Sequence, residues 1–130
     1  MICLDSSFLI DFLRGKIDAI EKASQIKEDS AITTISIYEV MIGFHMMKNK
    51  SQEKINIFMS TLNNYEILNL DISASLLSSE IYAKLVSAGE MIDHLDCMIA
   101  GIMKSNEISS IITRNEKHFN RIGGIKTISY

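Results

Sequence analysis

The sequence predicts an α/β fold in which a mostly parallel central sheet is flanked by helices. Short apolar segments rich in β-branched residues alternate along the chain with longer segments whose apolar residues recur at helical spacing. This alternation is typical of strand–helix–strand crossover units, which place neighbouring strands parallel to one another. At 130 residues the chain has the usual size of one domain, so we expect one domain over residues 1–130.

The elements of the first half follow from apolar spacing and from residues that start or stop helices. Residues 1–4 are short and apolar, as in a buried strand, and Ser6 and Ser7 are good helix-capping residues. Apolar residues then recur at helical spacing until Gly15, which ends the helix. The remaining elements expected here are a helix at 17–27, a strand at 31–34, and helices at 35–48 and 52–62.

The second half repeats the alternation of strands and helices. Gly89 breaks the chain between two helical segments. In parallel sheets the ligand crevice lies outside the carboxyl ends of the strands, where the strand order reverses, so we look for chemistry there. The expected elements are a strand at 65–68, helices at 72–87 and 92–105, a strand at 110–113, a short helix at 116–122, and a final edge strand at 125–129.

Composition excludes several classes of protein. The apolar fraction of 47% excludes intrinsic disorder, and the longest apolar run, residues 97–103, is far shorter than the roughly 20 residues of a membrane span. No signal peptide is evident, and Cys3 and Cys97 lie in apolar segments, as reduced core cysteines do. The net charge of −3 argues against a plain DNA-binding module. We expect a cytoplasmic protein.

Two acidic residues stand out because of their positions. Asp5 directly follows the first strand, which places it at a carboxyl end, although an aspartate there also suits a helix N-cap. Glu39 lies in a helix that is apolar on nearly every side, where an unpaired ionised carboxylate would be costly. Glu39 therefore requires a cation, a proton or a crevice, or else an arginine or lysine partner in the core.

A second group of polar residues lies in the last third of the chain. Asp93 and Asp96 are one turn apart at the start of an apolar helix, so their carboxylates share one face, although the helix dipole alone also favours acids there. Thr113 and Asn115 follow the fourth strand at its carboxyl end, where Asn115 also suits an N-cap. Arg114 between them suits either a phosphate contact or a solvated loop.

Brought to one sheet edge, these residues would form a cluster of oxygen donors, which suits Mg²⁺ or Mn²⁺. Zinc is disfavoured because the three histidines lie at no ligand spacing and the two cysteines are far apart in sequence. The sequence contains neither a glycine-rich phosphate loop nor the elbow of a serine hydrolase. Metal-assisted phosphoryl chemistry remains.

The segments that carry these residues resemble the PIN-domain ribonucleases, particularly the VapC toxins of prokaryotic toxin–antitoxin pairs. The similar segments appear in family order and together cover essentially the whole chain: 2–11, 35–43, Gly89 with 92–100, and 113–115 with Phe119 and Ile122. The resemblance implies a PIN-like domain over residues 1–130 with acids at the carboxyl edge of its sheet. It also implies an endoribonuclease that depends on Mg²⁺ or Mn²⁺. In such an enzyme a water activated by the metal ion attacks the scissile phosphate in line with the leaving group.

The resemblance also implies site residues. The family's fourth position is often aspartate and is Asn115 here, so a second metal ion would be held weakly. The metal site would consist of Asp5, Asp96 and Glu39, with Asp93 as an additional acid. The catalytic residues would be Asp5, Glu39, Asp96, Asn115 and Thr113.

The expected partners are an RNA substrate, a cognate antitoxin whose extended tail covers apolar grooves, and a second copy of the chain in a homodimer. Adaptable contact area for such partners, or alternatively ordinary core, is offered by Met41, Phe44, Met46 and Met47. The basic residues that would steer RNA, or alternatively are ordinary solvated side chains, are Arg14, Lys16, Lys48, Lys50 and Lys54.

Other functions stay open at this point. A PIN-type nuclease that matures RNA as housekeeping would need no antitoxin. A non-catalytic interaction domain would use the same acids as helix caps and core ion pairs. A phosphatase that forms a phospho-aspartate is disfavoured, because Ser7 stands where a second aspartate would be expected.

Overall fold

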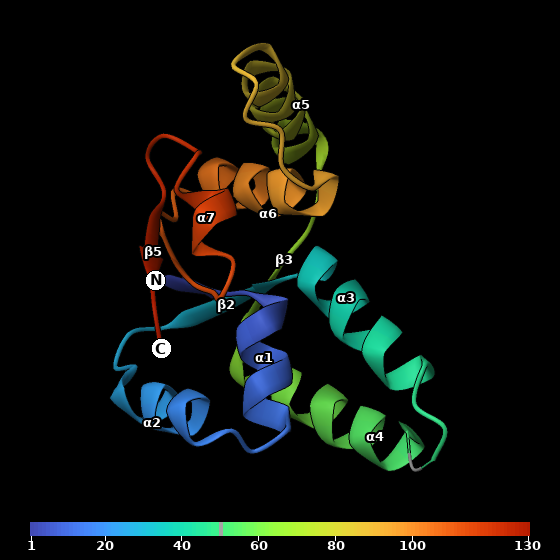
Figure 1. Cartoon of the computed structure of the whole chain (residues 1–130). Helices are drawn as coiled ribbons and strands as arrows, with labels where there is room; N and C mark the ends of the chain where they lie inside the picture. The colour runs from blue at the N-terminus through green and yellow to red at the C-terminus, as the bar shows by residue number, and fades with distance from the viewer. Residues whose placement is uncertain (50) are drawn as a thin grey trace.

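Five short parallel strands form the central sheet (Figure 1). In the computed structural model, which describes residues 1–49 and 51–130, every neighbouring pair of strands is parallel and the order is β3-β2-β1-β4-β5. The predicted α/β fold with a parallel sheet is therefore confirmed, including a last strand at the sheet edge. The strands are β1 (Ile2–Leu4), β2 (Ser30–Thr33), β3 (Glu66–Leu68), β4 (Ser110–Ile112) and β5 (Lys126–Ile128).

Helices connect the strands, and each predicted helix is present. The helix predicted to reach residue 48 ends at His45, and the one predicted from residue 92 begins at His94, because the Asp93 side chain accepts a hydrogen bond from the Leu95 backbone and caps it. The sequence did not predict the short 3₁₀ helix η1 (Leu62–Asn64). The α-helices are α1 (Ser6–Leu13), α2 (Ile17–Gln25), α3 (Thr34–His45), α4 (Ser51–Thr61), α5 (Ile72–Ser87), α6 (His94–Ser105) and α7 (Glu116–Phe119).

The sheet carries one hydrophobic core on each face, because successive side chains of a strand point to opposite sides. In β1, Ile2 and Leu4 pack into the core covered by α1 to α4, whereas Cys3 packs into the core covered by α5 to α7 (Figure 1). Cys97 belongs to that second core, and both cysteines are buried free thiols, as predicted. In the described part of the chain, no helix has both the length and the apolar character needed to cross a membrane.

The strand order reverses between β1 and β4. From β1 the chain adds β2 and then β3 on one side, and it returns through α5 and α6 to place β4 on the other side of β1. Leu4 of β1 is in register with Ile112 of β4, so the residues that follow these two strands emerge next to each other. Asp5 and Thr113 therefore lie at the switch point of the sheet, where ligand sites of open parallel sheets usually lie, and we call this region the acid crevice.

Helices α5 and α6 approach each other closely at Gly101. A Cβ atom added there would lie 2.6 Å from the Ala74 carbonyl oxygen and 2.7 Å from the Ser78 backbone nitrogen, so backbone atoms would have to move. Since α6 also carries Asp96, this contact fixes the depth at which one acid of the crevice is held. Glycine at 101 is thus a packing requirement of the site-bearing helix.

We expect Gly101→Ala to lower the free energy of unfolding by about 1–3 kcal/mol, the usual cost of overpacking a filled core. Gly43→Ala is the matched control, because a Cβ at Gly43 in α3 would meet nothing within 4 Å and alanine favours helix. Urea unfolding followed by circular dichroism measures both changes. Equal stability of the Gly101→Ala and Gly43→Ala chains would contradict the packing argument.

Candidate active site

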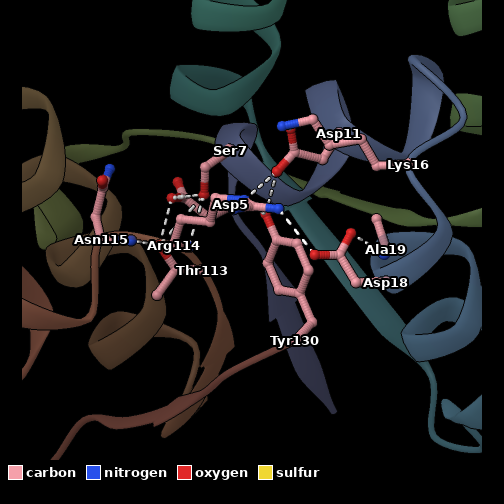
Figure 2. Close-up of polar contacts among 10 residues, drawn as sticks. All are labelled: Asp5, Ser7, Asp11, Lys16, Asp18, Ala19, Thr113, Arg114, Asn115 and Tyr130. Carbon is pink, nitrogen blue, oxygen red and sulfur yellow. Dashed lines mark hydrogen bonds and ion pairs between the residues drawn. The ribbon is translucent and has the colours of Figure 1, made fainter.

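Asp5 lies at the centre of the crevice and is completely buried. Its Oδ2 accepts hydrogen bonds from Thr113 Oγ1 at 2.7 Å and from Ser7 Oγ at 2.9 Å (Figure 2). Among the described residues, Asp5 Oδ1 is the one buried side-chain polar atom without a hydrogen-bond partner. Burial raises the pKa of Asp5, and the hydrogen bonds from Thr113 and Ser7 oppose that rise. Asp5 thus occupies the N-cap position of α1, but its oxygens serve the crevice instead of the helix.

Glu39 reaches the crevice from α3 and is half-buried. Its Oε1 accepts a hydrogen bond from Ser6 Oγ at 3.1 Å, so its partner is a hydroxyl and not the arginine or lysine of a core ion pair. Burial and the negative charges of Asp5 and Asp96 raise the pKa of Glu39 to about 7. The serine pair predicted to cap α1 therefore binds the acids instead, Ser6 to Glu39 and Ser7 to Asp5.

Asp96 lies in the first turn of α6 and is 5% exposed. Its Oδ2 is 2.6 Å from Nδ1 of His118, a residue of α7. Burial raises the pKa of Asp96, the hydrogen bond with His118 opposes this, and the charge of Asp5 adds to it. The contact orients one carboxylate oxygen of Asp96 and leaves the other available to the crevice.

Asp93 and Asn115 lie at the margin of the crevice. Asp93 is exposed and caps α6, its Oδ1 accepting from the Leu95 backbone nitrogen at 2.7 Å, which is the helix-end role considered for it above. Asn115 is exposed at the N-cap position of α7, and its backbone nitrogen donates to Thr113 Oγ1 at 2.9 Å. The side chains of Asn115 and Arg114 point to opposite sides of their loop (Figure 2).

Asp5, Glu39, Asp93 and Asp96 influence one another through charge. The charges of Asp5 and Asp93 raise the pKa of both Glu39 and Asp96, which places the four carboxylates in one electrostatic neighbourhood. Within residues 1–49 and 51–130, no three acidic, histidine or cysteine side chains stand close enough together to hold a metal ion as they are. Carboxylates that share a site repel one another unless a cation or a proton offsets their charge.

Arg114 anchors the loop that carries Thr113 and Asn115. Its Nε donates to Asp11 Oδ2, and its NH2 group donates to Asp18 Oδ2 at 3.1 Å (Figure 2). Tyr130 Oη donates to the same Asp11 oxygen at 2.8 Å. Arg114 thus anchors the loop to α1 and α2, although its side chain is 44% exposed.

Sequence reasoning missed Asp11, although it is a buried acid among apolar neighbours in α1, which is the signal that identified Glu39. Burial opposes ionisation of Asp11, but hydrogen bonds from Lys16, Tyr130 and Arg114 lower its pKa overall. Lys16, predicted to steer RNA, pairs with Asp11 at 3.0 Å. Lys50, predicted for the same role, lies outside the described residues.

Comparison with known proteins identifies the fold family. The chain matches the PIN domain family over residues 2–125. The ribonuclease VapC1 of Methanocaldococcus jannaschii is 30% identical over 123 residues, which is 93% of this chain and 80% of that protein. The tRNA(fMet)-specific endonuclease VapC of Salmonella typhimurium is 26% identical over 125 residues, 95% of this chain and 92% of that protein.

The fold is also that of a solved VapBC complex. In the DNA-bound VapBC from Salmonella typhimurium, the matching chain superposes with a TM-score of 0.86 at 23% identity, over 98% of this chain and 96% of that one. The structure has a parallel sheet with acids at its switch point, and the family model covers nearly the whole chain. These two findings define the class of protein. The chain belongs to the PIN domain family.

The raised pKa of Glu39 predicts a pH dependence of stability. In the unfolded chain this carboxyl ionises around 4.5 and in the folded chain around 7, so stability should fall as the pH rises from 4.5 to about 7. With divalent metal removed by EDTA, Glu39→Gln should therefore unfold about 2–8 °C higher than wild type above about pH 8, and at the wild-type temperature below about pH 4.

Thermal unfolding across this pH range measures the difference. Glu80→Gln is the control, because Glu80 is an exposed glutamate of α5 outside the crevice. If the difference in unfolding temperature between Glu39→Gln and wild type were the same at all pH values, folding would not raise the pKa of Glu39.

Proposed function

We propose that this chain is a metal-dependent endoribonuclease that hydrolyses RNA phosphodiester bonds as the toxin of a toxin–antitoxin pair. Membership of the PIN family and the similarity to proteins named as VapC ribonucleases support the nuclease function. The single observation that carries the assignment to this crevice is the convergence of Asp5, Glu39 and Asp96, with one buried carboxylate oxygen left unpartnered. A purely structural cluster would satisfy that oxygen.

The crevice residues fit a bound divalent cation. The donors are carboxylate oxygens, which Mg²⁺ and Mn²⁺ prefer, and a cation would satisfy Asp5 Oδ1. Asp5, Glu39 and Asp96 would hold the ion, and Asp93 could contribute the carboxylate oxygen that does not cap α6. When bound, the ion supplies Lewis-acid stabilisation of charge on the scissile phosphate and lowers the pKa of water.

The chain's own residues prepare this site. Thr113 and Ser7 hold Asp5 Oδ2 and thereby leave the other oxygen free to bind a cation. Ser6 orients Glu39, and His118 orients Asp96. These neighbours fix the orientation of acids that would otherwise turn away from one another, so the arrangement is preorganised before substrate arrives. Asn115, exposed beside Thr113, is assigned to the substrate side of the site.

We also propose an antitoxin as the protein partner, as in the VapBC complexes to which the fold is similar. Between α1, α3 and α4 lies a groove of about 190 Å³ lined by Ile10, Val40, Phe44 and Met47. Of the residues predicted to offer contact area, Phe44 is mostly core at 8% exposure, whereas Met46 and Met47 are 78% and 38% exposed. An apolar antitoxin segment suits this groove, and the homodimer remains a prediction.

Asp96→Asn should abolish growth arrest and lower RNA cleavage by more than about a hundredfold, since even changes outside a metal's direct ligands cost about 10–100-fold. Asp29→Asn is the matched control, because Asp29 is an exposed aspartate preceding β2 at the opposite edge of the sheet. Growth after induced expression and sequencing of new RNA 5′ ends give the result. Arrest by both the wild-type and Asp96→Asn proteins would indicate inhibition by binding, and an Asp96→Asn protein that still cleaves would refute the site.

Divalent metal should stabilise the folded chain as well as support cleavage. Saturating Mg²⁺ or Mn²⁺ at about 100 times its dissociation constant should stabilise the fold by about 2.7 kcal/mol, and Asp5→Asn should remove most of this gain. Thermal unfolding with and without metal measures the effect independently of activity. A midpoint that does not respond to either metal in the wild-type chain would leave the acids with a structural role only.

A further inference from the structure

Next to the acid crevice lies an open hollow of about 740 Å³ between α5, the 91–95 segment and α7. One wall is a stacked pair of rings, Tyr82 of α5 and His94 of α6, with centroids 4.3 Å apart and planes 20° from parallel. His94 is exposed and Tyr82 is half-buried. Met91, 61% exposed, lies beside them, with its sulfur 3.6 Å from Tyr82 Oη.

We propose that this hollow is a nucleobase subsite, in which an unpaired base of the RNA beside the scissile phosphate stacks on the Tyr82–His94 pair. The inference rests on the proposed ribonuclease function and extends it to the recognition of the substrate. An exposed aromatic stack with a soft thioether beside it offers the flat, polarisable surface on which single-stranded bases are held.

The chemistry of the hollow suits a base better than a phosphate. Its described lining residues include one carboxylate, Asp93, and no lysine or arginine. A phosphate would be repelled by Asp93 and would find no lysine or arginine in the lining, whereas an uncharged base carries amino or ring N–H groups that donate hydrogen bonds to an aspartate. Arg121 lies just outside, donating to the Met91 carbonyl oxygen at 3.2 Å, where it supports the segment that bears the thioether.

His118 links the hollow to the acid crevice. This residue lines the hollow and also contacts Asp96 Oδ2 at 2.6 Å through Nδ1. Asp93 likewise lines the hollow while its charge raises the pKa of Glu39. A base in the hollow therefore lies within one side chain of the acids that we assign to the scissile phosphate. That proximity makes the stacked pair a candidate determinant of the nucleotide preferred at the cut.

Equilibrium binding tests the subsite without cleavage. The probes are fluorescein-labelled single-stranded RNA homopolymers, one for each base, and the parent is the Asp96→Asn chain with Mg²⁺ present. These RNAs should bind at least about fivefold more weakly when the chain also carries His94→Ala or Tyr82→Ala. The reason is that base–aromatic stacking contributes at least about 1 kcal/mol. Tyr82→Phe keeps the ring and should bind as the parent does. Tyr65→Ala is the matched control, a half-buried tyrosine preceding β3 at the opposite edge of the sheet.

A second readout reports on stacking itself. RNA containing 2-aminopurine should be quenched on binding to the parent chain and less quenched on binding to the His94→Ala chain, which a merely structural role would not produce. Unchanged affinity and quenching in both ring variants would overturn the subsite, as would a parent chain that binds no RNA. So would a shift from dimer to monomer caused by His94→Ala, since a second copy of the chain would then occupy this face. Failure of the ribonuclease function would appear separately, as absence of metal-dependent cleavage by the wild-type chain.

Discussion

The cost of burying the Asp5 carboxylate is the constraint on which the rest of the crevice depends. A carboxylate held in the interior must be hydrogen-bonded, protonated or neutralised by a cation. Thr113 and Ser7 donate hydrogen bonds to one of its oxygens and leave the other unpartnered. A cation or a proton at the end of β1 is therefore favourable. The charge of Asp5 also raises the pKa of Glu39 in α3 and of Asp96 in α6, so a cation or proton would stabilise these carboxylates as well.

Much of the fold was predictable, because local residue patterns indicate each helix and strand. Short apolar segments rich in β-branched residues located the strands. The parallel sheet followed because strands separated by helices are usually joined by right-handed crossovers. Helix ends were less accurate, as at His45 and Asp93, because caps depend on backbone geometry that residue types indicate only loosely. Asp5 and Glu39 were found for physical reasons: Asp5 follows a strand at its carboxyl end, and Glu39 is an acid in an otherwise apolar helix.

The rest depends on contacts between residues that are far apart in sequence. Arg114 contacts Asp11 across 103 residues and Tyr130 contacts it across 119, and no local pattern indicates either pairing. His118 was considered only as a zinc ligand, yet it contacts Asp96 across 22 residues. The cap that Asp93 provides was evident only from its hydrogen bond with Leu95, and its role as a metal ligand stays a prediction. Single residues thus reveal unusual burial, whereas their partners emerge only from the assembled fold.

The pairing of β1 with β4 has a consequence for biosynthesis. Asp5 leaves the ribosome 108 residues before its partner Thr113, and His118 follows later still. The crevice is therefore completed only after Thr113 and His118 have emerged, and strand pairing over such a separation is slow compared with local helix formation. A nascent chain therefore carries all four acids before Thr113 and His118, which orient Asp5 and Asp96, have been made. Any activity that needs the arranged acids is delayed until those two residues have been added to the chain.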